Sequence, residues 1–247
     1  MIDQLKGQQE KLLISERHEA WEHVARKLAH EIKNPLTPIQ LTIDNLKSKY
    51  GKFIDNLDKD KYDKNLNTIL TQIKQIENLV NEFSDFARMP KPILKKIDLN
   101  KVIFRSVNLH ELSEKDKTFR LSKGKSSNDV SGDEEQLNRV FINLIKNSIE
   151  SIHEKRSKNV DFKGKINIEI NDDSHYIYVS VADNGVGFKE NDNAKISAPY
   201  YTTKKNGTGL GLAVVSKIIT DHNSSILFNT INNGARVDIK LPKYYGK

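Results

Sequence analysis

The chain has 247 residues, a formal net charge of +7 and no cysteine. Without cysteine, a disulfide scaffold, a zinc–thiolate site, an iron–sulfur cluster and a thiol nucleophile are excluded. No apolar run approaches the roughly 18–20 residues that cross a bilayer, and no secretory signal opens the chain. We therefore expect a soluble protein of one large or two modest domains in a reducing compartment. The positive charge fits a solvated lysine-rich surface better than a nucleic-acid footprint.

The first part of the chain, up to about residue 92, predicts two helices. Apolar residues recur three and four positions apart in two runs: Trp21, Val24, Leu28, Leu36, Ile39, Ile43 and Leu46, and then Leu66, Ile69, Ile73, Ile76, Val80 and Phe83. This spacing predicts a helical hairpin with a polar connection at residues 51–60. Because such helices have narrow apolar faces, we expect them to pair with a second copy as a four-helix bundle.

His30 is expected on the solvent side of the first helix, about 200° around the axis from Leu28 and Ile32. A lone exposed histidine is most often an ordinary surface residue. Here Glu31 can accept a proton from one imidazole nitrogen, which leaves the other nitrogen as a nucleophile. Asn34 lies four residues on and shares the face of His30. These neighbours favour a chemical role for His30.

Prolines interrupt both helical patterns. Pro35 removes a backbone donor and should bend the first helix just past the histidine. The alternative is that Pro35 and Pro38 end one helix and start another. Pro90 and Pro92 end the second helix and start a linker, after which the periodicity changes.

The second part of the chain, about 155 residues, predicts a compact α+β domain. Residues 166–170, 177–182, 226–228 and 237–241 alternate or cluster like strands. Asp133 predicts the N-cap of a helix that runs to about Ile152. On that helix Asn143 and Asn147 are four apart and share a face. They suit a hydrated Mg²⁺ with phosphate oxygens, although two ordinary surface asparagines are an equal alternative.

Two glycine-rich segments follow. Asp183 to Gly187 come after a strand, so the Asp183 carboxylate could accept from an exocyclic amine such as adenine N6, while Gly185 and Gly187 permit a tight turn against a base. An ordinary strand-exit turn is the alternative. Gly207 to Leu212 precede an apolar helix at 213–219 and could present backbone N–H groups to an anion. Between them, residues 188–206 could form a lid that carries Lys204 and Lys205 close to phosphates.

Taken in order, His30–Leu36, Asn143–Asn147, Asp183–Gly187 and Gly207–Leu212 resemble the four signature motifs of the two-component sensor histidine kinases. Residues 25–41 are most similar to the NtrY branch, nitrogen-regulation sensors that act with an NtrX-type regulator. Tyr200 and Tyr201 stand where the family often has phenylalanine. Residues 233–235 match the last glycine-rich turn only loosely, so no site residue is assigned there.

The resemblance implies a helical hairpin that forms a dimeric four-helix bundle, followed by an α+β two-layer sandwich of the Bergerat type that binds ATP. It implies an incoming linker at 1–20, the hairpin at 21–89, a second linker at 90–97 and the ATP-binding domain at 98–247. Because residues 1–20 resemble the middle of a linker, we expect a cytoplasmic catalytic portion of an inner-membrane parent protein.

In family terms His30 attacks the γ-phosphoryl group of ATP with Glu31 as base, and Asn147 holds Mg²⁺. The phosphoryl group then passes to an aspartate of a response regulator, and Asn34 would orient water for a phosphatase activity. The residues expected to bind ATP are Asn143, Lys146, Asn147, Asp183, Gly185, Gly187, Thr203, Lys204, Gly207, Thr208, Gly209, Leu210, Gly211 and Leu212.

Two rival functions remain open. One is a Bergerat-fold ATPase in which His30 is incidental; related ATPases carry a glutamate where Asn143 stands, and an amide cannot activate water as a carboxylate does. The other is a non-catalytic interaction module or a basic nucleic-acid binder. The chain has the glycine and asparagine motifs of an active site and lacks a basic aromatic stripe, which disfavours both forms of the second rival.

Overall fold

The computed structural model describes residues 2–111, 118–122, 128–189, 192–204, 207–232 and 234–245. The chain divides into two compact units, Met1–Pro90 and Lys91–Lys247. In the described residues, no helix is both long enough and apolar enough to span a membrane. The finer division into linkers at 1–20 and 90–97 stays a prediction.

The first unit is a helical hairpin, as predicted. Helix α1 spans Ile2–Asn45, a π-helical turn follows at Leu46–Tyr50, and α2 spans Asn56–Ala87. The second helix thus starts within the segment expected to be a polar connection, which reduces that connection to residues 51–55. The Tyr62 hydroxyl donates to the Leu46 carbonyl at 2.8 Å and closes the hairpin.

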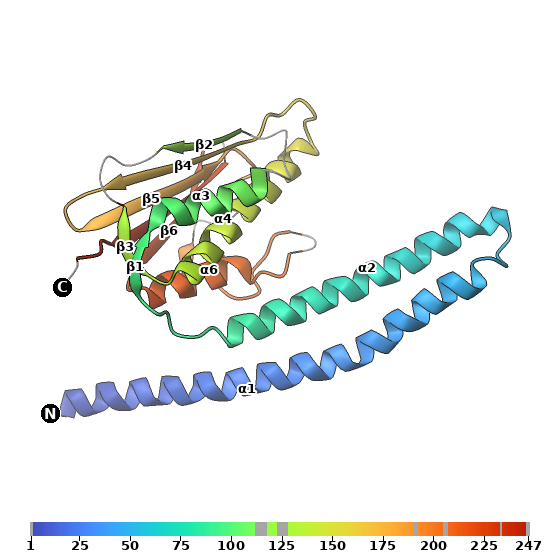
Figure 1. Ribbon diagram of the computed structural model, residues 1–247, viewed down its shortest axis with the longest axis horizontal. Helices are drawn as coiled ribbons and strands as arrows, with labels where there is room; N and C mark the ends of the chain where they lie inside the picture. The colour runs from blue at the N-terminus through green and yellow to red at the C-terminus, as the bar shows by residue number, and fades with distance from the viewer. Residues whose placement is uncertain are drawn as a thin grey trace. The chain divides into compact units, whose positions relative to one another are not determined.

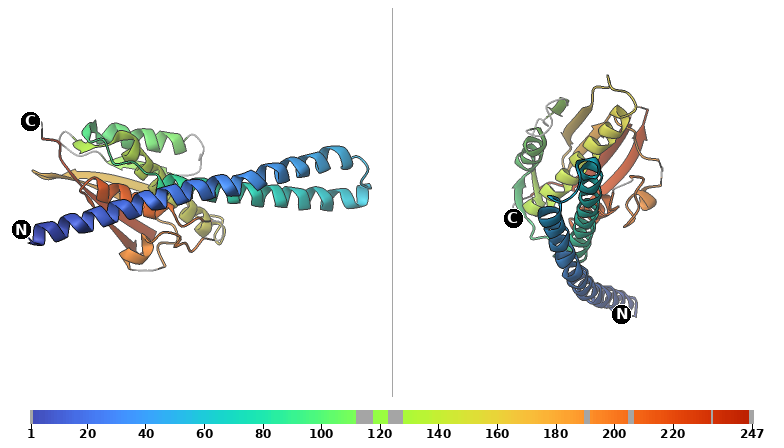
Figure 2. Two further views of the ribbon diagram at one scale, coloured as in Figure 1. Left: turned by 90° about the horizontal axis from the view of Figure 1, so that it is seen from below. Right: turned by 90° about the vertical axis from the view of Figure 1, so that its right-hand side faces the viewer.

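Helix α1 continues through both of its prolines, so the alternative of two separate helices is wrong. Figures 1 and 2 show that the axis of α1 is curved. A proline inside a helix removes one backbone hydrogen bond and commonly bends the helix axis. A curved axis is therefore consistent with the bend predicted from Pro35.

The apolar positions of the hairpin divide into two sets. Leu36, Ile43, Leu66 and Ile73 form the buried core between the helices. A second set with the same seven-residue spacing is largely exposed in the single chain: Ile32, Ile39, Ile69 and Ile76 at 39%, 46%, 44% and 44%. The single apolar stripe predicted for α1 is therefore wrong in detail, since Ala25 and Ala29 are buried while Val24 and Leu28 are exposed.

The second unit is a two-layer α/β sandwich. Its five-stranded sheet has the order β2-β4-β5-β7-β6, and a separate two-stranded sheet pairs β1 with β3. The strands are β1 (Lys95–Asp98), β2 (Thr118–Ser122), β3 (Asp129–Gly132), β4 (Lys165–Asp172), β5 (Tyr176–Asp183), β6 (Ser225–Ile231) and β7 (Gly234–Pro242). The helices are α3 (Leu99–Glu111), α4 (Glu134–Arg156), α5 (Asn193–Ile196) and α6 (Gly211–Asp221).

Helices α3, α4 and α6 lie on one face of the large sheet (Figures 1 and 2). Among the described strands of this sheet, β2 and β4 run parallel and the other neighbours are antiparallel. Strand β5 alternates exposed and inward positions, with Ile177, Val179 and Val181 buried beneath the helices. Asp183 occupies the next inward position of the same alternation, so the strand period places a carboxylate in the helix-covered layer.

The predicted fold class is confirmed in its helical hairpin and its α+β sandwich. The strands expected at 166–170, 177–182, 226–228 and 237–241 all lie in β4, β5, β6 and β7. Helix α3 and strands β1, β2 and β3 were not predicted from the sequence.

Candidate functional site

Helix α4 carries most of the site, and several hydrogen bonds hold its N-cap residue. Asp133 is the predicted N-cap: its Oδ1 accepts from the Gln136 N–H at 3.1 Å. Its Oδ2 accepts from the Ile93 N–H at 3.0 Å, and its own N–H donates to Nε2 of the buried His222 at 2.9 Å. The start of α4 is thereby tied to the chain before β1 and to the end of α6.

The two asparagines of α4 face the start of α6. A Cβ atom built on Gly211 would lie 3.3 Å from Asn143 Oδ1 and 3.7 Å from Asn147 Nδ2. The Asn143 amide group also donates to the Arg139 carbonyl at 2.8 Å, which fixes its orientation. Two motifs separated by more than 60 positions in the sequence therefore meet, with both amides beside the N-terminus of a helix.

Asp183 is buried at the end of β5, with 7% of its surface exposed. Its Oδ1 accepts from the Gly185 N–H at 2.8 Å and from the Ser151 hydroxyl at 3.3 Å. Desolvation raises the pKa of the Asp183 carboxyl, and hydrogen bonds from Gly185, Ser148, Ser151 and Ala235 oppose that rise. The carboxylate is thus desolvated yet held in one orientation by several donors.

Glycines surround Asp183 for two different reasons. Gly187 and Gly234 have positive φ angles of 75° and 153°. A Cβ on Gly234 would overlap the Asp183 carbonyl, and a Cβ on Gly185 would overlap the Ser151 side chain. The sequence predicted that Gly185 and Gly187 both permit a tight turn. The positive φ angle of Gly187 agrees with this prediction. Gly185 is required instead because a side chain there would collide with Ser151 of α4.

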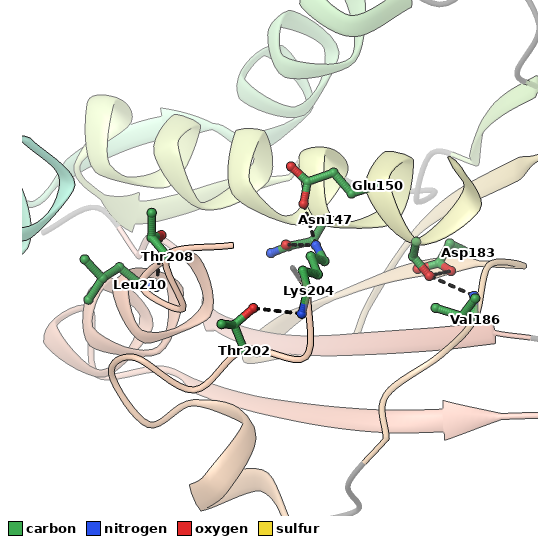
Figure 3. A network of polar contacts seen from close by, with 9 residues as sticks. Asn147, Glu150, Asp183, Val186, Thr202, Lys204, Thr208 and Leu210 are labelled. Atoms are coloured by element: carbon green, nitrogen blue, oxygen red, sulfur yellow. Dashed lines mark hydrogen bonds and ion pairs between the residues drawn. The ribbon is translucent and has the colours of Figure 1, made fainter. Parts of the chain in front are cut away.

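Lys204 connects the segment after α5 to helix α4 (Figure 3). Its ammonium Nζ lies 2.8 Å from Asn147 Oδ1 and 2.5 Å from Glu150 Oε2. Its backbone N–H donates to the Thr202 hydroxyl at 3.1 Å. The side chains of Lys204 and Glu150 are 31% and 39% exposed. The Lys204 ammonium thus contacts an amide oxygen and a carboxylate oxygen on the face of α4 that carries the paired asparagines.

The loop before α6 is compact. The Thr208 hydroxyl accepts from the Leu210 N–H at 3.4 Å, and the Tyr200 N–H donates to the Gly209 carbonyl at 3.0 Å. Gly209 has a φ angle of 71°, and a Cβ there would collide with the Tyr200 backbone. Leu210 is 1% exposed and anchors the entry of α6 in the core. The loop is therefore held against the segment that carries Tyr200.

The other predicted residues are less constrained by the structure. Lys146 and Thr203 have exposed side chains, and Leu212 is half-buried near the start of α6. A side chain on Gly207 would collide with the Thr202 hydroxyl. Lys205, predicted near the phosphates, and Asn233, in the last glycine-rich turn, lie outside the described residues.

His30, Glu31 and Asn34 lie in the first unit. All three are exposed on α1, as predicted for His30, although Leu28 and Ile32, from which its position was predicted, are themselves exposed at 44% and 39%. The Glu31 carboxylate lies 4.0 Å from the Lys27 ammonium, a pair with side chains 62% and 70% exposed. An exposed pair of this kind contributes little to stability. The His30 imidazole is exposed to solvent.

Sequence reasoning missed five residues of the site, which are Ser148, Glu150, Ser151, Lys155 and Gly234. The four on α4 lie on the faces that contact Asp183, Lys204 and the turn after β5. The spacing of Glu150 and Ser151 from Asn147, three and four positions, was a usable signal, because residues three and four apart share a helical face. Ser148 and Lys155, one and eight positions from Asn147, carried no such signal.

The oxygens around the Lys204 ammonium have the chemistry of ligands for a cation. The position of the Lys204 ammonium between two oxygen ligands suits a hard cation, for which Asn147 is the predicted ligand. In the described part of the chain, no group of three or more His, Asp or Glu side chains could hold a metal by itself. A Mg²⁺ ion there would complete its shell with phosphate and water oxygens.

Two families match the chain in the order of its two units. Residues 20–92 match the His Kinase A (phospho-acceptor) domain, and residues 132–245 match the histidine kinase-, DNA gyrase B-, and HSP90-like ATPase family. Together they contain the exposed histidine of the hairpin and the motifs gathered around α4.

Curated relatives cover most of the chain. Nitrogen regulation protein NtrY of Azorhizobium caulinodans is 36% identical over 93% of this chain and 29% of its own length. A putative sensor histidine kinase NtrY-like of Rickettsia felis is 37% identical over 98% of this chain and 39% of its own length. The chain therefore spans between a quarter and two fifths of the length of these relatives.

Solved structures agree in fold. The catalytic domain of histidine kinase ThkA is 30% identical, with a TM-score of 0.53 over 61% of this chain and 95% of that chain. ThkA in complex with the response regulator protein TrrA is 26% identical, with a TM-score of 0.66 over 98% of this chain and 67% of that chain. With both family matches and the NtrY relatives, the likeness shows that this chain belongs to the sensor histidine kinases.

Proposed function

We propose that this chain is a catalytic core that phosphorylates its own His30 from Mg-ATP and passes the phosphoryl group to an aspartate of a response regulator. The observation that carries the proposal is the meeting of Asn143, Asn147 and Gly211 in the second unit, in a chain whose first unit exposes His30. Phosphoryl transfer needs alignment and charge neutralisation more than covalent assistance, and these groups supply both.

Within the nucleotide site each group has a distinct task. Asp183 would accept a hydrogen bond from the adenine amino group, and the N-terminus of α6 would present N–H groups to phosphate oxygens. Asn147 would hold Mg²⁺, which neutralises phosphate charge when bound. Lys204 would exchange its contact with Asn147 and Glu150 for a phosphate oxygen, because an ammonium and a metal ion compete for the same amide oxygen.

On the hairpin, the chemistry would depend on His30 in its neutral form. One ring nitrogen would attack the γ-phosphorus while Glu31 accepts the proton of the other nitrogen, and the bond from the γ-phosphorus to the β–γ bridging oxygen would break, so that ADP leaves with its electron pair. Asn34, on the same face, would orient a water molecule toward the aspartyl phosphate of the regulator and so give a phosphatase activity. Asn143 carries an amide, which cannot act as a general base for water, so ATP hydrolysis without transfer should be slow.

We further propose that the chain acts as a homodimer. The exposed set on the hairpin, Ile32, Ile39, Ile69 and Ile76, lies at heptad spacing and would pair with the same set of a second copy. The regulator would dock on the hairpin near His30, as a partner of the kind that ThkA has in its complex with TrrA. We propose an NtrX-like receiver domain as this regulator, because residues 25–41 resemble the NtrY branch.

The test is exposure of the full chain to γ-labelled Mg-ATP. We expect acid-labile, alkali-stable label on the protein, its absence in His30→Gln, and its retention in His175→Gln, which alters an exposed histidine of the β4–β5 turn. Addition of a receiver domain should move the label to that domain. Multiple-turnover hydrolysis that survives His30→Gln, without protein label, would instead identify an ATPase.

A further inference from the structure

Two side chains of α4 hold the turn that follows β5. The Ser151 hydroxyl donates to Asp183 Oδ1 at 3.3 Å and accepts from the Val186 N–H at 3.0 Å. One helical turn later, the Lys155 ammonium donates to the carbonyls of Asn184 and Gly185 at 2.7 and 3.0 Å. The last two turns of α4 therefore bind the backbone of the segment that begins with the buried carboxylate.

The backbone N–H groups of Asn184, Gly185 and Val186 each have an acceptor. Asn184 donates to the Lys165 carbonyl at 3.3 Å, Gly185 to Asp183 Oδ1 at 2.8 Å, and Val186 to Ser151. The two carbonyls between them are taken by Lys155. The contacts that Ser151 and Lys155 make to this backbone are partly buried, so loss of either α4 side chain would release groups that have no other protein partner among these contacts.

Lys155 is itself fixed from other directions. Its ammonium lies 4.8 Å from the centre of the Phe162 ring, a cation–π contact, and it belongs to the last turn of α4, where a positive charge is favourable. The Asn184 side chain accepts from the Lys165 N–H at 2.7 Å and donates to the Lys163 carbonyl at 3.0 Å. Lys155 thus joins α4, the chain before β4 and the turn after β5.

We infer that Ser151 and Lys155 are positioning residues for base recognition. This inference rests on the proposed function, in which Asp183 receives the adenine amino group. Ser151 and Gly185 hold the Asp183 carboxylate, and Lys155 restrains the turn that follows it. The carboxylate therefore stays in one place. Guanine presents a carbonyl oxygen where adenine presents its amino group, and a fixed carboxylate repels that oxygen. A loosened turn would let the carboxylate move aside, so preference for adenine should fall.

The experiment measures binding of Mg-ADP and Mg-GDP to the full chain by calorimetry. Lys155→Met removes the two carbonyl contacts, and Lys155→Arg can restore them because a guanidinium offers several donors. Lys158→Met is the matched control, because Lys158 lies just after α4 and pairs with Glu154 at 3.4 Å on the surface. Ser151→Ala removes the second anchor with a smaller change of side-chain volume, in case Lys155→Met folds poorly.

We expect Lys155→Met to raise the Kd for Mg-ADP about tenfold, the size of effect that follows the loss of a charged hydrogen bond. The Kd for Mg-GDP should change less, so the ratio between the two nucleotides should fall. Lys155→Arg should restore the ratio, and Lys158→Met should leave it unchanged. Autophosphorylation should show a raised KM for ATP and an unchanged rate at saturation.

A merely structural role would have a different signature. In that case Lys155→Met and Ser151→Ala would lower the Tm while the Kd for Mg-ADP and the nucleotide ratio, measured well below the Tm, would stay at the parent values. That result would overturn the inference and leave the proposed function intact. A parent chain that binds no adenine nucleotide would overturn the proposed function itself.

Discussion

Replacing Glu150 with glutamine should tighten ATP binding. Glu150 accepts a 2.5 Å contact from the Lys204 ammonium, which also contacts Asn147 Oδ1 at 2.8 Å. In the proposed site, ATP with Mg²⁺ would use both the Asn147 oxygen and the Lys204 charge, so the existing contacts would have to be exchanged when the nucleotide binds. Glutamine keeps the shape of the side chain and removes its charge, which weakens the contact that competes with the nucleotide.

The size of the effect follows from the exposure of the pair. Two unit charges 4 Å apart interact by about 1 kcal/mol in water and about 4 kcal/mol at an effective dielectric constant of 20. With side chains 31% and 39% exposed, Lys204 and Glu150 are screened by solvent, and pairs of this kind contribute up to about 1 kcal/mol net. Releasing that amount lowers the Kd for Mg-ATP about fivefold.

The assay is calorimetric titration of Mg-ATP, with a double-mutant cycle between Glu150→Gln and Lys204→Met. If the ion pair is responsible, the gain from Glu150→Gln should disappear when Lys204 is already methionine. If general repulsion between Glu150 and the phosphates is responsible, the gain should persist in that background. Glu154→Gln is the matched control, one turn further along α4, where Glu154 pairs with Lys158 at 3.4 Å.

A weaker affinity in Glu150→Gln would refute this reasoning. It would mean that Glu150 supports the bound cation, directly or through water, more than it restrains Lys204. The same measurement without Mg²⁺ separates the two roles, because a residue that only restrains Lys204 should still oppose ATP binding when no metal is present.

Three further outcomes are expected. Burial raises the pKa of the Asp183 carboxyl, so the folded state binds its proton more tightly than the unfolded state does. The contribution of this group to the free energy of unfolding is therefore lost as the pH rises from about 4 toward the raised pKa. Over that range the Tm of the parent chain should fall relative to the Tm of Asp183→Asn, and Asp183→Asn should lose Mg-ADP binding. Gly234→Ala should lower the free energy of unfolding by about 2 kcal/mol or more, measured by denaturant titration, because its Cβ overlaps the Asp183 carbonyl. Ile76 is 44% exposed, so Ile76→Asp should give a folded monomer in sedimentation. Ile73 is 5% exposed, so Ile73→Asp should unfold the hairpin. A dimer that persists in Ile76→Asp would contradict the proposed interface.

The elements that the sequence predicted well are those with a strong local period. Helices α1 and α2 and strands β4, β5 and β7 have apolar residues at regular spacing over eight residues or more. Strands β1 and β3 have four residues each, and β2 has five. A period of two cannot be recognised in so short a run. The pairing of β1 with β3 also depends on partners 31 to 37 positions apart in the sequence.

Periodicity alone also could not assign the apolar face of the hairpin that pairs within the chain. Ile39 and Ile43 lie on the same helix at spacings that both fit a helical stripe, yet Ile43 is 5% exposed and Ile39 46%. One set fills the seam between α1 and α2, and the other remains for a further partner. The distinction depends on the orientation of α2 relative to α1, which neither helix encodes by itself.

For the site, the sequence motifs supplied the groups that we propose to touch a nucleotide, and they missed the side chains that hold those groups. Asp183 stood out because it follows a strand and precedes two glycines, but Gly234, Ser151 and Lys155 look ordinary in their own segments. Gly234 acquires its role only because β7 pairs with β5 and brings its first residues against the Asp183 carbonyl. Lys155 acquires its role only because the end of α4 lies over the turn. A side chain that binds backbone carbonyls leaves no sequence motif, because the carbonyl of any residue can serve as its acceptor. Its role is determined by the tertiary fold. Such a residue is therefore found by tracing hydrogen bonds from the motif residues to their neighbours in the structure.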